Sequence, residues 1–312
     1  MIYLSICIPT YQRIEITRNT IASIYADLEE VDMTEFEVIV SDNDAGQSSI
    51  CFKKEFPYEN FHYYQTKCEG FLNSFHVLSY GQGVFLKLHN NYTQLKKGTL
   101  KYLINEIKSY IGIKPTMYFT NGLLEFNRKK EYTNFNEYMY DLSYFSSWST
   151  GFGIWKDDFL RIVDNVQVDK MFPQTSLFIS CREKNKYVLN DNILFLDQKV
   201  PRKGGYNPYK VFGIDYLNIL NSLCMDGSLE KRVFDKIKTD LLNGYLASRF
   251  FKTVIAKMDK FDSADIKKHL SVYYSDIDYY RMIIYSWFSP IGFIIRKLKN
   301  GWLVTRLFSD FL

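Results

Sequence analysis

Three polar segments, each directly after an apolar run, carry the side chains best suited to hold a phosphorylated ligand. They are Pro9 to Arg13 (PTYQR), Ser41 to Asp44 (SDND) and Lys87 to Thr93 (KLHNNYT). An aspartate at a strand end can accept hydrogen bonds from a nucleobase N–H or from ribose hydroxyls. A tyrosine offers a flat apolar wall, and an arginine near a helix start can pair with phosphate oxygens in bidentate fashion.

The elements that must position these segments alternate between strands and helices. Apolar residues that alternate or run together indicate strands at 4–9, 36–44, 61–66 and 83–88, and spacings of three and four indicate helices at 14–28 and 71–81. Such alternation is typical of β-α-β units and predicts an α/β fold with a mainly parallel sheet. In such sheets the ligand lies beyond the carboxyl ends of the strands, where the strand order reverses. The three polar segments fall at these ends.

Composition narrows the class of protein. The chain has 312 residues, 46% of them hydrophobic, and a formal net charge of only +4, so it can bury a core and gives little support for nucleic acid as a partner. Its five cysteines are odd in number and form no C-x-x-C pair, which argues against a disulfide framework or a zinc site. The first residues already form a strand, leaving no room for a signal peptide, so we expect a cytoplasmic protein.

The second part of the chain is predicted to be mainly helical. We expect further strands at 116–120 and 192–196, and helices from about Tyr209 onward. Leu229, Val233, Ile237 and further apolar residues recur every four positions, and Ser228 is a natural N-cap for that helix. We therefore predict two domains, residues 1–208 and residues 209–312.

The C-terminus has the composition of a membrane-surface helix. Between Tyr279 and Ser309 all charged residues are basic: Arg281, Arg296, Lys297, Lys299 and Arg306. The apolar stretch is shorter than the roughly 20 residues that span a bilayer. Ser289 and Pro290 would start a helix that ends near Asn300. This helix could lie on an anionic leaflet or pack on its own domain, and the sequence leaves both alternatives open.

The first two polar segments resemble a known enzyme family. PTYQR and VSDND are similar to the opening motifs of family 2 glycosyltransferases of the GT-A fold, in particular the bacterial enzymes that build O-antigen and capsular polysaccharide, over roughly residues 3–200. The resemblance implies that a loop and nearby side chains hold the nucleoside of an activated sugar: Pro9, Thr10, Tyr11, Arg13, Asp42 and Asp44. CEGFLNSF is a partial match to the next motif and adds Gly70 and Asn73.

The third segment departs from the family. The family places an Asp-x-Asp motif here because two carboxylates hold a hard divalent cation on the diphosphate, but this chain has His89, Asn90 and Asn91. Either cationic side chains replace the metal, with Lys87, His89, Arg202 and Lys203 as candidates, or a looser Mn²⁺ or Mg²⁺ site survives on His89 or Asn91 with help from Asp44. The cofactor stays open, with a metal-free site preferred.

The catalytic base is the least defined of the expected residues. An inverting transfer needs a carboxylate that deprotonates the acceptor hydroxyl, and many relatives use the aspartate of a Glu-Asp pair that this chain lacks. Asp169 is the nearest candidate. Asp157 and Asp158 are further candidates, although their place in WKDDF also suits a helix cap.

Two functions remain after these comparisons. The first is a glycosyltransferase that moves a sugar from a nucleotide-sugar donor to a lipid-linked or oligosaccharide acceptor at the inner face of the cell membrane. The second is a weakly active or inactive relative that serves as a scaffold in a polysaccharide assembly complex, which the missing carboxylates favour. A nicotinamide-dependent oxidoreductase is set aside because no G-x-G-x-x-G follows the first strand.

Overall fold

The structure is a computed structural model that describes residues 1–26, 28, 31–200 and 204–299. It divides into two compact units, Met1–Val200 and Pro201–Leu312, whereas the sequence analysis placed the boundary after residue 208. Arg202 and Lys203 lie outside the described residues.

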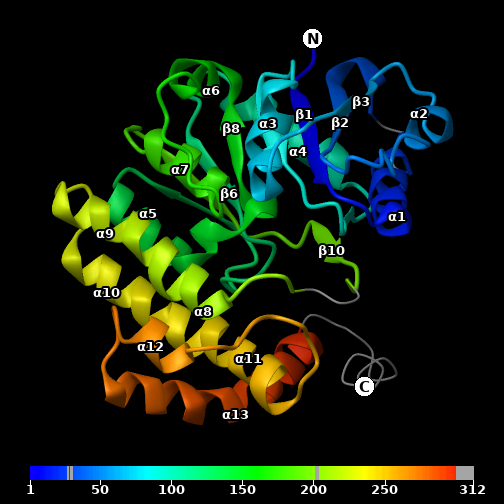
Figure 1. The fold of residues 1–312 in the computed structure, drawn as a ribbon. Coiled ribbons are helices and arrows are strands. Elements are labelled where there is room, and N and C mark those ends of the chain that lie inside the picture. The colour runs from blue at the N-terminus through cyan, green and yellow to red at the C-terminus, as the bar shows by residue number, and fades with distance from the viewer. Residues whose placement is uncertain (27, 29–30, 201–203, 300–312) are drawn as a thin grey trace. The chain divides into compact units, whose positions relative to one another are not determined.

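The centre of the first unit is a five-stranded sheet in the order β3-β2-β1-β4-β8 (Figure 1). Its strands are β1 (Leu4–Thr10), β2 (Phe36–Asp42), β3 (Phe61–Gln65), β4 (Phe85–Leu88) and β8 (Gly153–Trp155). All neighbours pair in parallel except β4 and β8, which are antiparallel. The predicted α/β class and its mainly parallel sheet are confirmed.

One face of this sheet forms the main core. Leu4, Ile6 and Ile8 alternate along β1 and point to the same face, as the two-residue period of a strand requires. They pack in one buried cluster with Ile21 and Ile24 of α1 (Ile14–Tyr25) and with Leu100 through Ile107 of α4 (Thr99–Tyr110). The other helices of this unit are α2 (Phe52–Glu55), α3 (Asn73–Ser79), α5 (Phe135–Leu142), α6 (Lys156–Ile162) and α7 (Pro173–Ser180).

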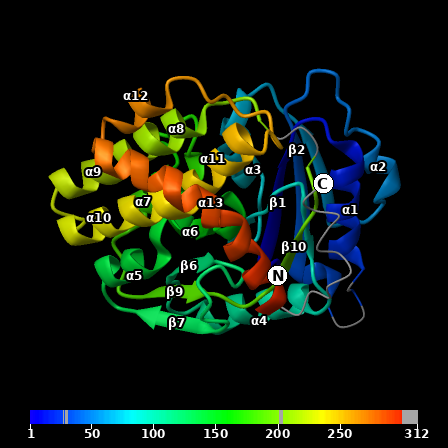
Figure 2. The same cartoon turned by 90° about the horizontal axis from the view of Figure 1, so that it is seen from below.

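Two smaller sheets extend the unit. The strand β6 (Thr116–Phe119) runs parallel to β9 (Tyr187–Asn190), and β7 (Lys129–Tyr132) is antiparallel to β9 on its other side (Figure 2). The strand β5 (Thr93–Leu95) pairs with β10 (Phe195–Asp197). β6 confirms the strand predicted at 116–120, while β10 covers only the end of the one predicted at 192–196.

The second unit is helical, as the sequence predicted. It contains α8 (Pro208–Lys210), α9 (Leu217–Met225), α10 (Lys231–Asp240), α11 (Ala247–Phe250), α12 (Ile266–Leu270) and α13 (Asp276–Lys299), with π-helical turns at Val211–Tyr216, Leu241–Leu246 and Phe251–Ile255. The periodic residues Val233, Ile237 and Leu241 are buried. The predicted cap is wrong, because helix α10 begins at Lys231 and Ser228 lies in the preceding turn.

The C-terminal helix is longer than the sequence indicated. Helix α13 begins at Asp276 and runs without interruption through Ser289 and Pro290 to Lys299. The prediction that a separate helix starts at Ser289 is therefore wrong, and Asn300 and Arg306 lie outside the described residues. Among the helices of the described ranges, none is both long and apolar enough to cross a membrane.

Candidate active site

The order of the central strands brings the three polar segments to one edge of the sheet. β1 lies between β2 and β4, so the chain leaves β1 toward one side and later returns on the other. Thr10 stands opposite Asp42 in the register of β1 and β2, and Cys7 stands opposite Leu88 in that of β1 and β4. This reversal of strand order is where α/β sheets bind ligands beyond the carboxyl ends of their strands.

The side chain of Asn73 ties the ends of β1 and β2 together. At the start of α3, its amide donates to the main-chain oxygen of Ser41 (2.8 Å) and to that of Thr10 (3.3 Å), while its own oxygen accepts from the Ser41 hydroxyl (2.7 Å). Asn43 is bound to the same region through the Asn73 amide (3.3 Å) and through the carbonyl of Gly70 (3.2 Å). The sequence predicted that Asn73 binds a nucleotide. In the structure its side chain is buried and holds the two loops together.

The loop after β1 presents two exposed side chains. Gln12 and Arg13 both have left-handed backbone angles, with φ of 55° and 62°, so the chain turns sharply before α1. Two consecutive left-handed residues other than glycine are strained and are typical of functional loops. Tyr11 is 55% exposed and Arg13 is exposed, whereas Thr10 is buried. The predicted aromatic wall and the predicted phosphate partner therefore stand free at the sheet edge.

The Asp42 carboxylate holds the loop that follows β2. It is buried, and its Oδ1 accepts from the main-chain N–H of Asp44 (2.9 Å). Its Oδ2 accepts from the N–H of Ser49 (3.2 Å) and from the hydroxyl of Tyr63 (3.0 Å). Burial, and then the Asp42 charge, raise the pKa of Tyr63, which keeps this donor protonated. Both oxygens are thus engaged by protein groups, so Asp42 holds the loop in place.

Asp44 is the carboxylate next to the loop after β1. The nearby Ser48 side chain most strongly, and then the N–H of Gly46 (3.4 Å) and the side chain of Gln12, lower the pKa of Asp44. The main-chain oxygen of Asp44 accepts from the side-chain amide of Gln65 (2.8 Å). Asp44 is therefore ionised at neutral pH and stands beside the loop that exposes Tyr11.

His89 and Asn91, which stand where the resemblance predicts an acidic motif, make hydrogen bonds within the protein. His89 donates from Nε2 to the main-chain oxygen of Thr93 (2.6 Å), and burial together with the charge of Lys87 lowers the pKa of its ring to about 3. Asn91 donates to the hydroxyls of Thr10 (3.0 Å) and Thr17 (3.2 Å). These side chains are neutral and turned inward, so they tie β4 to β1 and α1.

Lys87 is buried beneath this loop. Its ammonium donates to the main-chain oxygens of Leu88 (3.0 Å) and Thr150 and lies over the rings of Phe119 (5.0 Å) and Phe195 (5.1 Å). Burial lowers its pKa to about 7. This placement does not support a direct contact between Lys87 and a phosphate, because its ammonium is enclosed by protein atoms.

The three candidate bases have different surroundings. Asp157 pairs with Lys114, and Asp158 pairs with Lys184 (2.6 Å) and Arg161 (3.1 Å) in the first turn of α6, the helix-start position that the sequence suggested as their alternative role. Asp169 is half-buried before α7, and its Oδ1 accepts from the N–H groups of Met171 and Phe172, both at 2.8 Å. Its Oδ2 has no hydrogen-bond partner among the described residues. Asp169 is thus the oriented carboxylate of the three.

Several residues of the site escaped the sequence analysis. The hydroxyl of Ser149 donates to the Oδ1 of Asn90 (2.6 Å), and the N–H of Asn90 donates to the hydroxyl of Thr150 (3.1 Å). At the start of α7, the Gln174 amide and the Thr175 hydroxyl donate to the main-chain oxygens of Ser147 (2.7 Å) and Ser146 (3.1 Å). Their segment, 144–153 (YFSSWSTGFG), is rich in aromatic residues and carries two glycines, a signal that could have pointed to them. It now forms the wall of the site beside β4.

Comparison with known proteins identifies the fold. No protein-family model and no curated protein sequence matches the chain. Solved structures do match, among them S. aureus TarS 1-349 in complex with UDP-GlcNAc, with a TM-score of 0.58, 15% identity and coverage of 86% of this chain and 78% of that chain. The fold is the GT-A fold. The mannosyltransferase PcManGT from Pyrobaculum calidifontis, in complex with GDP-Man and Mn²⁺, matches with a TM-score of 0.54 and 11% identity over 96% of this chain and 87% of that chain.

A longer TarS structure sets the limit of the likeness. It matches with a TM-score of 0.55 and 17% identity, and this chain covers only 45% of its length. At such identities the likeness establishes the GT-A glycosyltransferase fold and leaves the activity, substrates and partners of this chain to its own residues.

The GT-A site of this chain does not fit a divalent cation. Hard cations require several oxygen ligands, usually carboxylates, and no group of three or more histidine, cysteine, aspartate or glutamate side chains within the described ranges is placed to hold one. The Nε2 of His89 is already bonded to a main-chain oxygen, and the side-chain oxygen of Asn91 would be a single neutral ligand without carboxylates beside it. The looser Mn²⁺ or Mg²⁺ site considered from the sequence has no support in this geometry.

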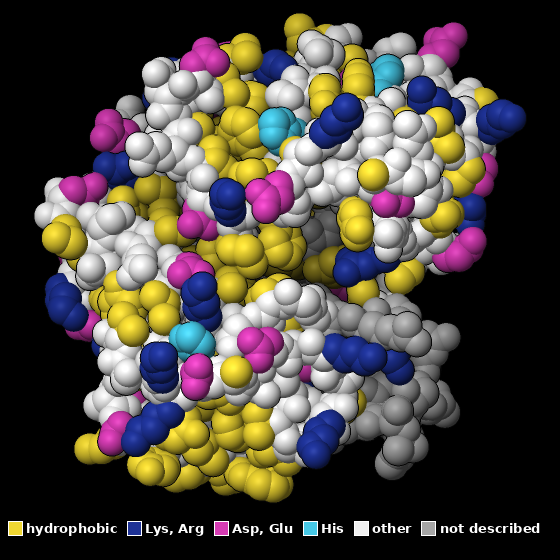
Figure 3. All heavy atoms as spheres, viewed as in Figure 1, with side chains coloured by type: hydrophobic (Ala, Val, Ile, Leu, Met, Phe, Trp, Pro, Cys, Tyr) yellow, Lys and Arg dark blue, Asp and Glu magenta, His cyan; other side chains and the backbone are white. Residues whose placement is uncertain are grey.

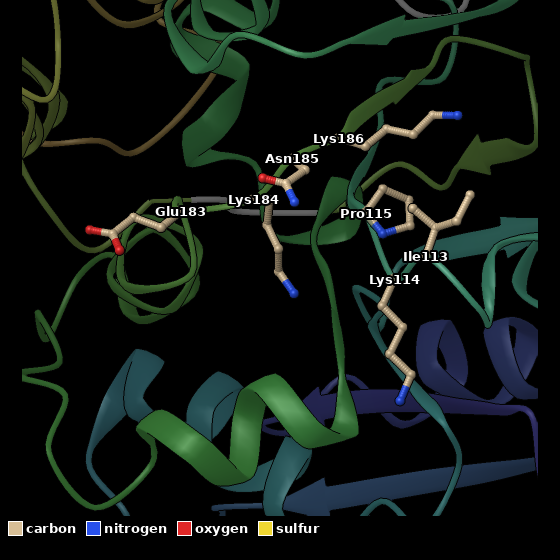
Figure 4. A pocket seen from close by; sticks show the side chains of 7 residues that line it. All are labelled: Ile113, Lys114, Pro115, Glu183, Lys184, Asn185 and Lys186. Carbon is tan, nitrogen blue, oxygen red and sulfur yellow. The ribbon is translucent and has the colours of Figure 1, made fainter.

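A surface recess of about 210 Å³ lies at another edge of the GT-A unit (Figure 4). It is lined by residues that precede β6 and β9: Ile113, Lys114, Pro115, Glu183, Lys184, Asn185 and Lys186. These are the amino ends of two parallel strands, not the carboxyl ends. Lys114, Lys184 and Lys186 are paired with Asp157, Asp158 and Glu131, so their charges are compensated. The recess is not part of the candidate active site.

Proposed function

We propose that the protein is a glycosyltransferase that takes a sugar from a nucleotide-sugar donor without using a protein-held metal ion. The observation that carries this proposal is the edge of the GT-A sheet, where the loops after β1, β2 and β4 are tied together by Asn73 and Asn91. Two exposed side chains at this edge, Tyr11 and Arg13, are suited to bind a nucleotide. At the position where a cation would be held, it has neutral side chains that bind the protein itself.

The donor would lie across the ends of β1 and β2. Tyr11 is the apolar wall for the base or ribose, Asp44 is the carboxylate that accepts from a base N–H or a ribose hydroxyl, and Arg13 is the cation for the diphosphate. Asp42 supports them indirectly by fixing the loop that carries Asp44. The complexes of TarS with UDP-GlcNAc and UDP, and of PcManGT with GDP-Man, support a donor of this class.

The transfer itself would be a single displacement that inverts the anomeric carbon. The acceptor hydroxyl oxygen forms the new bond to that carbon while the bond from the carbon to the diphosphate oxygen breaks, and the diphosphate leaves with the electron pair. A carboxylate takes the proton of the hydroxyl. Asp169 fits this role because two N–H groups orient one of its oxygens and no described group occupies the other.

The acceptor we propose is a growing bacterial surface glycan of the O-antigen or capsule type, presented on a lipid carrier at the inner face of the membrane. The supporting observation is the pair of motifs PTYQR and VSDND, which resemble family 2 enzymes with such substrates. The wall formed by Ser149, Thr150 and the start of α7 would face this acceptor.

The decisive experiment measures the thermal stability of the full chain with UDP, GDP, CDP and dTDP, each with Mn²⁺ or with EDTA. A ligand at about a hundred times its dissociation constant adds roughly 2.7 kcal/mol to the free energy of unfolding, which raises the melting temperature measurably. We expect one nucleotide to stabilise the protein equally in Mn²⁺ and in EDTA. A shift that requires Mn²⁺ would overturn the metal-free site.

The same measurement decides between the enzyme and a scaffold. The inward-turned His89 and Asn91 also suit a relative that has lost catalysis. If no nucleotide shifts the melting temperature, the transferase proposal fails and a scaffold role in a polysaccharide assembly complex becomes the better description.

A further inference from the structure

One face of helix α13 exposes a continuous row of large apolar side chains. These side chains are between 58% and 79% exposed and belong to Ile277, Tyr280, Ile284, Trp287 and Phe288. Their spacing of three or four residues, with Trp287 and Phe288 adjacent at the end, places them on one side of the helix. We call this row the α13 apolar face. Hydrophobic side chains gather along the lower edge of Figure 3, over the helix labelled α13 in Figure 1.

The opposite side of the same helix is firmly packed. Met282 and Ser286 are completely buried, one turn apart, and α13 packs on α11 and on the turn Leu241–Leu246 of its own unit. Asp278 fixes the start of the helix by accepting from the N–H of Ser275 (3.0 Å) and from its hydroxyl (2.9 Å). The helix is therefore held in place with its apolar face outward. Soluble proteins rarely leave such a contiguous face exposed unless a partner covers it.

Basic residues accompany the α13 apolar face. Lys267 of α12 pairs with Asp276 (3.1 Å) and lies over the rings of Tyr279 (6.0 Å) and Tyr280 (5.8 Å). Beyond Asp278 the helix continues to Lys299 without an acidic residue. Arg281 pairs back with Asp278 (2.9 Å), and the sequence adds Arg296, Lys297 and Lys299. The partner is therefore expected to be apolar at its contact and negatively charged around it.

We infer that the α13 apolar face docks on an anionic phospholipid surface, with the helix lying parallel to the leaflet. Tryptophan and tyrosine prefer the boundary between headgroups and acyl chains, and lysine and arginine near that boundary each add about 1 kcal/mol of attraction to an anionic leaflet. A second copy of the chain is the less suitable occupant, because four basic residues (Arg281, Arg296, Lys297, Lys299) against two acidic ones (Asp276, Asp278) give each α13 a net charge of +2, so two stacked copies would place like charge side by side. The docking itself does not depend on the proposed function. Only its role rests on that function, because the docking would bring the enzyme to a lipid-linked acceptor.

The test is flotation of the purified full chain with vesicles of phosphatidylcholine alone or mixed with phosphatidylglycerol. We expect binding to the mixed vesicles, little binding to phosphatidylcholine, and a loss of binding as salt is raised. The double variant Ile284→Ser with Trp287→Ser should lower the partition coefficient at least tenfold. Met225→Ser, at a residue of the same unit that is 83% exposed but lies at the end of α9, is the matched control and should bind like the parent.

Three outcomes would overturn the inference. The first is that the parent does not float with either kind of vesicle. The second is that the double variant floats as well as the parent. The third is that light scattering shows a dimer that the double variant abolishes, while neither protein binds lipid. The nucleotide-induced shift in melting temperature is measured on the same samples and should be identical in parent and double variant. A nucleotide shift without vesicle binding therefore contradicts only the docking surface, and vesicle binding without a nucleotide shift contradicts only the transferase.

Discussion

The amide of Asn91 donates to the hydroxyl of Thr10 across 3.0 Å, although 81 positions separate the two residues in the chain. This bond joins the loop after β4 to the end of β1. It also turns the amide nitrogen of Asn91 toward the protein, at the place where the resemblance to family 2 enzymes led us to expect carboxylates. With Asn91 at this position, the site has a hydrogen bond within the protein where the expected carboxylate would have bound a metal ion.

Removal of this tie should destabilise the protein measurably. Asn91→Ala removes the bonds to the hydroxyls of Thr10 and Thr17 and leaves both in a buried place. We expect the free energy of unfolding to fall by about 1–3 kcal/mol, the usual cost of an unmade buried hydrogen bond, in a urea titration. Asn185→Ala changes an exposed asparagine and should leave the midpoint unaltered. Equal midpoints for the two variants would show that the tie is unimportant.

Variants of Asp42 and Asp44 should affect different properties: the first should lower the stability of the loop after β2, and the second should weaken nucleotide binding. Asp42→Asn replaces one oxygen that accepts from Asp44, Ser49 or Tyr63 with an amide donor, so it should lower the melting temperature of the free protein. Asp44→Asn should change the free protein less and should abolish most of the shift caused by the bound nucleotide. Both variants are compared with the parent in EDTA. The assignment of Asp44 as a ligand group is wrong if the Asp44→Asn protein keeps the full shift.

The buried Lys87 should make stability depend on pH in the alkaline range. Its pKa is lowered from 10.5 to about 7 by burial, so between these values the unfolded chain holds a proton that the folded protein has lost. Stability contributed by this group therefore rises with pH. From pH 7 to pH 9 the parent should gain about 2 kcal/mol relative to Lys87→Met, a difference that follows from the two pKa values.

Denaturant titrations of both proteins at several pH values measure this difference. The comparison cancels the titration of groups far from Lys87, but not that of Cys7, whose pKa is raised by burial and lowered by the charge of Lys87. Parallel curves for parent and variant would mean that Lys87 keeps its proton throughout.

The sequence predicted the sheet and the edge where the site lies, because strand periodicity and polar strand ends are local signals. Ile6 and Ile8 alternate with Cys7 as a strand requires, and the loops after Thr10 and Asp42 do lie side by side. It could not predict which side chains point outward. Lys87 and His89 were expected to face a diphosphate, but each is turned into the core by contacts with Thr150 and Thr93, which depend on the tertiary fold.

The end of the helical region shows the same limit. Ser289 and Pro290 have the local preferences of a helix start, and the structure nevertheless continues α13 through both. Met282 and Ser286 come just before these two residues and are buried against the rest of the unit. This packing favours continuation of the helix. A proline in a helix interior is usually unfavourable, so only tertiary contacts could have revealed this continuation.

The proposed base can be tested without disturbing its surroundings. Asp169→Asn keeps an oxygen that can accept from the N–H groups of Met171 and Phe172, so the start of α7 should stay intact. The variant loses only the capacity to take a proton. We expect the nucleotide-induced shift in melting temperature to be retained and the rate of nucleoside diphosphate release from the matching donor, with acceptor present, to fall about 10²–10⁴-fold, the range that general base catalysis supplies.

Asp164→Asn is the control for this experiment, because Asp164 is an exposed aspartate in the turn after α6. It should release nucleotide at the rate of the parent. If Asp169→Asn also reacts at that rate, the proton must go to another group, and the oriented carboxylate before α7 would then serve only to hold the helix start against the wall formed by Ser146 and Ser147.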